Sequence, residues 1–277
     1  IQTRLYGEDN AITIATAATL GALLQNLGRF DDAEQMQRRV LAYWDAHEGR
    51  DHPNAIASLN NLAAVLREKG DHAEAESMQR EAVERWRAVV GEGHPYYAYG
   101  LLNLAAILRE RGAFDEAESL LAQALAIRRG LHGDDHPEVA NVLFQQASLA
   151  QRRGDLEEAE SLFREALGLR ERHLGAASPA TIMCQVGLAS ALRGRGRAAD
   201  AEPMLRDAVA ALRRSLPAGH PDIASAALEL GRVLREQGRT GDARAFLQEA
   251  LEIRRVCHGP ESPQAMEVAE ALAGTPA

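Results

Sequence analysis

A sequence repeat constrains the fold of this chain more than any other feature. Its step is constant and equals 42 residues, the separation of Pro53 and Pro95. Proline, glycine and alanine each recur at this step without an insertion or a deletion. The prolines are Pro53, Pro95, Pro137, Pro179, Pro221 and Pro263. The glycines are Gly28, Gly70, Gly112, Gly154, Gly196 and Gly238, and the alanines are Ala33, Ala75, Ala117, Ala159, Ala201 and Ala243. Interlocked series of this kind are typical of an array that stacks one supersecondary unit many times.

A second glycine series follows the same step and skips one unit, where Pro217 stands instead. Its members are Gly7, Gly49, Gly91, Gly133, Gly175 and Gly259. The chain therefore divides into six full units, with a partial unit at each end. The full units are residues 11–52, 53–94, 95–136, 137–178, 179–220 and 221–262. The partial units are residues 1–10 and residues 263–277, the latter being a partial repeat or a capping helix.

Each unit is expected to form two helices. In the unit that begins at Pro53, apolar side chains recur with helical spacing in two stretches. The first stretch holds Ile56, Leu59, Leu62, Ala63, Val65 and Leu66, and the second holds Ala75, Met78, Ala82, Val83 and Trp86. Gly70 and Gly91 end these helices, because glycine readily takes a left-handed conformation after a helix. No strand is needed anywhere, so we expect an all-α fold.

Small residues are expected to face each other across the two helices of each unit. The alanine series that includes Ala75 occupies the second helix, and a second small series occupies the first helix. The second series is Gly21, Ala63, Ala105, Ala147, Ala189 and Gly231. A larger side chain would push the two helix backbones apart, which predicts a close helix–helix approach here.

The residue before each proline has the properties of a helix N-cap. The histidines at this position are His52, His94, His136 and His220, and the other units have Ser178, Ser262 and Asn10. Serine and asparagine are strong N-caps, and proline at the next position suits the first helical turn. The histidines are therefore interpreted as capping or turn residues. Metal ligation is the alternative, but side chains one whole unit apart would not converge on one ion.

Composition excludes several classes of function. The formal net charge is −9, and a general nucleic-acid or anionic-membrane binder needs a basic surface instead. The two cysteines, Cys184 and Cys257, cannot form a disulfide framework, which favours a reducing cytoplasmic compartment. The chain contains no run of about 18 apolar residues, which is the length that a membrane-spanning helix needs.

The sequence contains no catalytic motif. A glycine-rich phosphate loop, HExxH, paired CxxC and GxSxG are all missing. Glutamates recur with the unit, and we interpret them as a solvated helix face rather than as general acids or bases. They are Glu34, Glu76, Glu118 and Glu160. We therefore expect no enzyme activity, no cofactor and no metal.

Two segments carry a resemblance to a known family. LNNLAAVLREKGDHAEAESMQREAV and HPEVANVLFQQASLAQRRGDLEEAESLFREALGLRERHLG resemble tetratricopeptide repeats of the kinesin-light-chain type. That type has a 42-residue unit, a lengthened second helix and an HP dipeptide that opens the next unit. The resemblance covers essentially the whole chain, residues 1–277. It implies a single right-handed superhelical solenoid of antiparallel helix pairs, whose first helices line a concave groove that often binds an extended peptide.

The resemblance places particular residues in that groove. Two positions early in each first helix give Ala15, Ala57, Tyr99, Asn141, Met183 and Ser225, and Ala18, Asn60, Leu102, Phe144, Val186 and Leu228. The apolar members would form a contiguous floor that favours a covering ligand. These members are Tyr99, Leu102, Phe144, Met183, Val186 and Leu228. The alternative is that some of them pack between neighbouring first helices, and the sequence favours neither.

A row near the end of each first helix also belongs to the implied groove. It reads Gln25, Arg67, Arg109, Gln151, Arg193 and Arg235, with Arg152 and Arg232 close by. Arginine here either complements the helix dipole or holds carboxylates of a bound peptide through its planar fork. The acids Glu68, Glu110 and Glu236 follow directly and would partly offset the charge, which leaves the net sign of the groove open.

One position of the second helix changes character along the chain. It holds Trp44, Trp86, Arg128, Arg170, Leu212 and Arg254 in successive units. We call it the Trp/Arg position. The pattern favours packing of the long second helix on its neighbour over a partner site on the convex face.

The predicted function is a non-catalytic scaffold that binds an extended protein or peptide partner with apolar anchors and acidic flanks. One alternative is a sensor or autoinhibitory segment of a larger signalling ATPase or protein kinase. Another is a structural array that self-associates through its ends. The chain begins in the tail of a second helix (residues 1–6) and ends within a first helix. It is therefore expected to be a segment of a longer polypeptide, unless the last helix serves as the cap.

Overall fold

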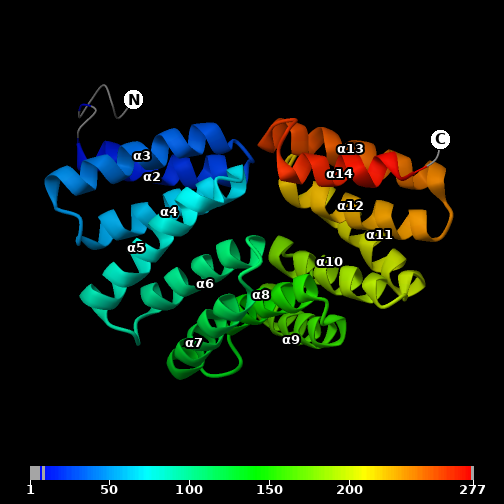
Figure 1. Ribbon diagram of the computed structural model, residues 1–277, viewed down its shortest axis with the longest axis horizontal. Helices are drawn as coiled ribbons and strands as arrows, with labels where there is room; N and C mark the ends of the chain where they lie inside the picture. The colour runs from blue at the N-terminus through cyan, green and yellow to red at the C-terminus, as the bar shows by residue number, and fades with distance from the viewer. Residues whose placement is uncertain (1–6, 8–9, 276–277) are drawn as a thin grey trace. The chain divides into compact units, whose positions relative to one another are not determined.

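Thirteen α-helices and no strand make up the part of the chain that the computed structural model describes, which is residue 7 and residues 10–275 (Figure 1). The helices come in pairs with the predicted step, and the all-α expectation is confirmed. We call the first helix of each pair the A helix and the second the B helix. The predicted tail of a preceding B helix, residues 1–6, lies outside the described residues.

The A helices begin at each repeat proline, except the first, which begins at Ala11. They are α2 (Ala11–Asn26), α4 (Pro53–Lys69), α6 (Pro95–Glu110), α8 (Pro137–Arg153), α10 (Pro179–Gly194), α12 (Pro221–Glu236) and α14 (Pro263–Ala273). The B helices are α3 (Phe30–His47), α5 (His72–Val90), α7 (Phe114–His132), α9 (Leu156–Leu174), α11 (Ala198–Ser215) and α13 (Thr240–His258).

Packing divides the chain into two compact units, Ile1–Ile127 and Arg128–Ala277, with the division inside α7. In the first unit consecutive helices from α2 to α6 pack on one another, and in the second unit consecutive helices from α8 to α14 do the same. A helices of successive repeats also touch each other, α2 with α4 and α4 with α6 in one unit, and α8 with α10 and α10 with α12 in the other. A single continuous domain over residues 1–277 stays a prediction.

Histidine caps start four of the A helices, as predicted. The Nδ1 atom of His52 accepts a hydrogen bond from the backbone N–H of Asn54 at 3.2 Å, and His94, His136 and His220 each accept one in the same way at 3.1 Å. Asn10 and Ser262 cap through their side-chain oxygens. The Ser178 side chain makes no capping bond. These bonds satisfy N–H groups that the first helical turn leaves without a partner.

The repeat glycines fall into two conformational classes. After an A helix, Gly154 has φ 98° and ψ 3°, the left-handed helical region. After a B helix, Gly175 has φ 80° and ψ 158°, a region that is essentially restricted to glycine. The missed step at Pro217 is also explained, because Gly219 supplies the positive φ, 87°, two residues later. The backbone N–H of His220 still bonds the Pro217 carbonyl at 3.1 Å, so the turn is kept.

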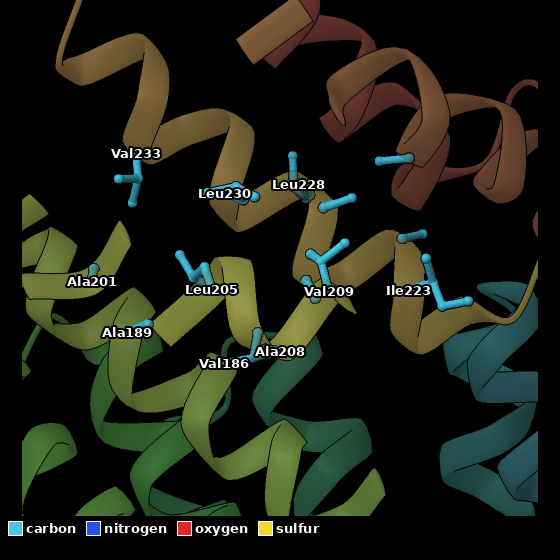
Figure 2. Packing of buried hydrophobic residues seen from close by; sticks show 14 of the residues in the cluster. Val186, Ala189, Ala201, Leu205, Ala208, Val209, Ile223, Leu228, Leu230 and Val233 are labelled. Carbon is cyan, nitrogen blue, oxygen red and sulfur yellow. The ribbon is translucent and has the colours of Figure 1, made fainter. Parts of the chain in front are cut away.

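The close helix–helix approach is confirmed. Every alanine of the Ala75 series is completely buried. A Cβ atom added to Gly231 would lie 2.7 Å from Leu247 Cγ and 3.3 Å from the Ala243 carbonyl oxygen, so even a methyl group at residue 231 would have to displace Leu247. The hydrophobic core follows these contacts from repeat to repeat, as Figure 2 shows for part of the second unit. None of the helices in the described ranges is long and apolar enough to cross a membrane.

Candidate functional site

The residues predicted to form an apolar floor differ widely in exposure. In the first unit, Tyr99 is 45% exposed and Leu102 only 7%. In the second unit, Phe144 and Met183 are half-buried. The remaining two, Val186 and Leu228, are 4% and 5% exposed. A ligand can therefore reach Tyr99, Phe144 and Met183 far more easily than the other three side chains.

Two of the buried members of the floor lie in the hydrophobic core of the second unit. Val186 on α10 and Leu228 on α12 belong to the same core cluster as Leu205 and Val209 of α11 (Figure 2). Their burial favours the packing alternative that the sequence left open. Whether any of the six side chains binds a partner stays a prediction, and Leu102, Val186 and Leu228 offer little surface for it.

Two of the predicted binding residues meet at a third residue, Arg170 of α9. Its Nη2 atom donates a hydrogen bond to Asn141 Oδ1 at 2.9 Å, and its guanidinium carbon lies 4.9 Å from the centre of the Phe144 ring. Phe144 also packs edge-on against Phe163, with ring centres 5.5 Å apart. Arg170 was not among the predicted binding residues. The change from Trp86 to arginine at the Trp/Arg position was the sequence signal that could have identified it.

The arginine row of the first unit is already paired with acids. Arg67 forms ion pairs with Glu68 and, at 3.7 Å, with Glu110, and Arg109 lies 3.6 Å from the same Glu110. Burial lowers the pKa of Arg67, but the charges of Glu68 and Glu110 outweigh it, and Tyr99 adds a smaller contribution in the same direction. The pKa of Arg67 is therefore raised above its usual value. The predicted offset of the arginine charge is present in this unit.

In the second unit the same row links each repeat to the next. Gln151 donates to Ser190 at 2.6 Å, and Arg193 pairs with Glu229 at 3.2 Å and Glu236 at 2.8 Å. Arg235 donates to the backbone oxygen of Ala271 at 2.9 Å.

Glu229 also binds Arg232, at 2.6 Å, and Arg232 in turn reaches Glu267 at 2.7 Å. Burial tends to raise the pKa of Glu229, but Arg232 and Arg193 outweigh it and hold the pKa below its usual value. The carboxylate therefore stays charged between its two arginines. In both units the row acts first as a set of contacts inside the protein.

A family model described as tetratricopeptide repeat matches residues 13–88, 54–129, 96–172, 145–214 and 222–275. Together these matches cover nearly all of the described helices. The chain belongs to the tetratricopeptide repeat family. Proteins of this family typically act as non-catalytic scaffolds for protein–protein interaction.

Solved tetratricopeptide repeat structures resemble this chain. A putative kinesin light chain of Podosopora anserina with nearly identical TPR-like repeats is 24% identical, with TM-score 0.56, over 74% of this chain and 96% of that one. BtubC (BKLC) from P. vanneervenii is also 24% identical, with TM-score 0.57, over 86% and 93%. A Rap protein complexed with Competence and Sporulation Factor is 14% identical, with TM-score 0.69, over 98% and 79%. At these identities the likeness shows the fold alone. No curated protein matches the chain by sequence.

Three of the four periodic glutamates of this tetratricopeptide repeat array, Glu34, Glu76 and Glu160, do not lie on a solvated face. The side chain of Glu160 is 2% exposed and binds Arg164, Arg195 at 2.5 Å and Arg197 at 3.1 Å. The same arrangement occurs three repeats earlier, where Glu34 binds Arg38 and Lys69. The prediction of a solvated face is therefore wrong for these positions.

The reason for the error lies in the next repeat. Glu34, Glu76 and Glu160 each take one basic partner four residues later on their own B helix and another at or just after the end of the A helix of the following repeat. Glu76 with Arg80 and Arg111, and Glu202 with Arg206 and Arg239, complete the set. Glu118 is exposed. A basic residue 35 residues after the acid, as Lys69 stands after Glu34, was the sequence signal for this inter-repeat contact.

Proposed function

We propose that this protein is a non-catalytic interaction scaffold whose A helices bind an extended peptide segment of a protein partner. One observation on α6 carries the proposal. Tyr99 keeps 45% of its surface exposed although it is a large aromatic residue. Four residues on, the side-chain Nδ2 atom of Asn103 is buried and has no hydrogen-bond partner among the described residues.

Side chains four residues apart on a helix are neighbours on one face. Tyr99 and Asn103 therefore offer an apolar anchor beside an unused hydrogen-bond donor. A buried donor without a partner is costly, and a peptide carbonyl group would supply the missing acceptor. An extended peptide carries such carbonyl groups along its whole length and can place an apolar side chain on Tyr99.

The remaining predicted binding residues keep different roles in this proposal. Within the second unit, Asn141, Phe144 and Met183 offer accessible contacts of their own on α8 and α10. Leu102, Val186 and Leu228 are buried and support the packing of their own helices rather than contact the peptide. Arg67, Arg109, Arg193 and the neighbouring Arg232 contact acidic flanks of the partner only if those flanks compete with the internal acids, and Arg235 only if they compete with the Ala271 carbonyl oxygen.

The Rap protein that resembles this chain was solved in complex with Competence and Sporulation Factor. That complex supports the idea that an array of this fold can bind a separate ligand. The chemistry of the ligand proposed for this chain is inferred from the side chains of this chain alone. The preformed A-helix surface would bind with little loss of entropy, and a few anchors would supply most of the affinity.

Selection of a phage-displayed random peptide library on the 277-residue chain tests the proposal. We expect a family of peptides with a shared apolar anchor, and Tyr99→Ala to weaken their binding about tenfold or more. Asn103→Ala should weaken it by a smaller factor.

Tyr96→Ala is the matched control, because Tyr96 is a 53% exposed tyrosine on the same helix that packs instead on Trp86 at 4.8 Å. It should leave affinity unchanged. The proposal fails if the library yields no peptide, or if the Tyr96 and Tyr99 variants lose affinity equally.

Self-association is a second candidate, favoured by the apolar face of α2. Ile12, Leu20, Leu23 and Leu27 are 37% to 53% exposed. The equivalents of Leu20 and Leu23 in the next repeat, Leu62 and Val65, are completely buried. Sedimentation of the chain over a range of concentrations should then show dimers that Leu23→Glu dissociates, and one molecular mass at every concentration would eliminate this candidate.

A further inference from the structure

Arg170 is a buried cation that has no carboxylate partner. Only 7% of the residue is exposed. Its Nη1 atom donates to the backbone oxygen of Ala180 at 2.6 Å and to the Cys184 sulfur at 3.2 Å, and Nη2 donates to Asn141 Oδ1 at 2.9 Å. All three acceptors are neutral. Within the described chain, no acidic side chain forms an ion pair with this guanidinium.

The preceding repeat shows what is missing. Arg128 occupies the same Trp/Arg position one repeat earlier, is buried to the same degree, and pairs with Glu138 at 3.3 Å. One repeat later, the residue equivalent to Glu138 is Ala180. Arg170 therefore has the environment of Arg128 without its counter-ion, and it turns to the Ala180 backbone instead.

A buried charge without a counter-ion is unfavourable, because the charge loses its hydration and neutral acceptors replace only part of it. The Phe144 ring, 4.9 Å from the guanidinium carbon, offsets a further part through its negative face. One edge of the guanidinium is still incompletely used. Its Nε atom is buried without a hydrogen-bond partner, and the neighbouring Nη2 binds only the Asn141 amide oxygen.

We propose that Arg170, together with Asn141 and Phe144, binds a carboxylate group of the partner peptide. A carboxylate that takes the place of the Asn141 oxygen accepts from Nε and Nη2 together, the two-bond geometry that suits arginine best. Asn141 and Phe144 are half-buried, so they form the surface cover through which the ligand reaches the guanidinium. This inference rests on the proposed peptide-binding function and names the chemistry that it recognises.

The assignment differs from the arginine row. Arg67, Arg193 and Arg232 are all neutralised by acids of the array, so an acidic peptide gains little from them. Arg170 offers a charge that nothing else in the described chain compensates. The acidic flank of the partner therefore binds at Arg170.

A substitution suggested by the repeat itself provides the sharpest test. Ala180→Glu places in α10 the carboxylate that Glu138 supplies to Arg128, and the first helical turn tolerates an acidic residue well. We expect this variant to fold, to unfold at a higher temperature than the wild type, and to lose the carboxylate site because the site is occupied from within. Arg170→Gln removes the cation, and Arg128→Gln is the control because that cation is already paired.

The first measurement uses sodium acetate alone as the probe, against sodium chloride at the same ionic strength. Acetate should raise the unfolding temperature of the wild type and of Arg128→Gln, and leave Ala180→Glu and Arg170→Gln unchanged. An acetate effect that is equal in the wild type and in Ala180→Glu overturns the inference.

The second measurement compares synthetic peptides selected on the wild type with analogues that carry Asn or Gln for Asp or Glu, and with a free or amidated C-terminus. Loss of the relevant carboxylate should weaken binding to the wild type roughly tenfold to a hundredfold, and should have no effect on Ala180→Glu. The amidated arm separates a C-terminal carboxylate from an acidic side chain. Selected peptides with no carboxylate preference overturn this inference and leave the scaffold function standing. An acetate response without any selected peptide overturns the peptide as the source of the carboxylate and leaves only the anion site at Arg170.

Discussion

Glu160 connects two repeats through a buried carboxylate that binds three arginines. Its carboxylate is 2% exposed and binds Arg164 on its own helix and Arg195 and Arg197 from the following repeat. Glu160→Gln keeps the size of the side chain and removes its charge. Hydrogen bonds to a charged group contribute about 1.5–3 kcal/mol each in the net balance. The three arginines are 33% to 54% exposed and can rehydrate, so we expect a total loss of about 2 kcal/mol rather than the sum.

Glu157→Gln is the matched control. Glu157 lies one helical turn earlier on α9, is 88% exposed, and pairs with the same Arg195 at 3.5 Å. An exposed ion pair contributes about 0–1 kcal/mol, so this variant should lose much less stability. Urea unfolding of the full chain followed by circular dichroism measures both losses, with the slope checked for a change in cooperativity.

The pH dependence gives an independent test of the same contact. Burial tends to raise the pKa of Glu160, but its bonds and charge interactions with Arg195 and Arg164 outweigh it and place the pKa below the usual value. A carboxyl group with a lowered pKa stabilises the fold above the pKa of the unfolded chain, and this stabilisation is lost as the pH falls through the folded pKa. The difference between wild type and Glu160→Gln should therefore be full at neutral pH and shrink below about pH 4. Equal losses in the Glu157 and Glu160 variants, or a pH-independent difference, would refute the reasoning.

Three further outcomes test the fold and the binding surface. Gly175→Ala should destabilise the chain by about 2 kcal/mol and Gly154→Ala by less than about 1 kcal/mol, as measured by the urea midpoints of the two variants. Neither added Cβ meets an atom within 4 Å, and only the backbone of Gly175 lies in the glycine-restricted region. Gly231→Ala should cost about 1–3 kcal/mol by overlap with Leu247, while Gly241→Ala, with open space around it in a helix, should be neutral or stabilising in the same assay. Added salt should weaken binding of an acidic peptide more than binding of its amide analogue in calorimetry, and an equal effect on both would exclude a charge contribution.

The features that the sequence predicted correctly are those that a short stretch of chain decides by itself. A histidine before Pro137 caps its helix through a bond two residues long, and the backbone of Gly154 needs a positive φ whatever surrounds it. Ala75 and its equivalents repeat because every helix pair has the same close approach. Such rules apply within one unit, and comparison of six units removes most of the ambiguity.

The features that the sequence did not predict depend on which neighbour a side chain meets. Tyr99 and Leu102 lie three residues apart on one helix, yet one is 45% exposed and the other 7%. Both are apolar enough for a binding surface, and the sequence pattern does not distinguish the exposed side chain from the buried one. The same limit applies to Glu160. Its sequence pattern predicts an exposed side chain, because the arginines that bury it come from the following repeat.

The two kinds of arginine show why charge alone is a poor guide to binding in a repeat array. Stacking places the acids of one repeat beside the bases of the next, so Arg193 with Glu229 and Glu236 contributes to cohesion and presents little net charge. A departure from the repeat has the opposite effect. Where Glu138 becomes Ala180 and arginine is kept at the Trp/Arg position, the array leaves one cation uncompensated at Arg170. In a protein built from copies, the position at which a paired residue loses its partner is therefore a stronger indicator of a ligand site than the number of charges in a row.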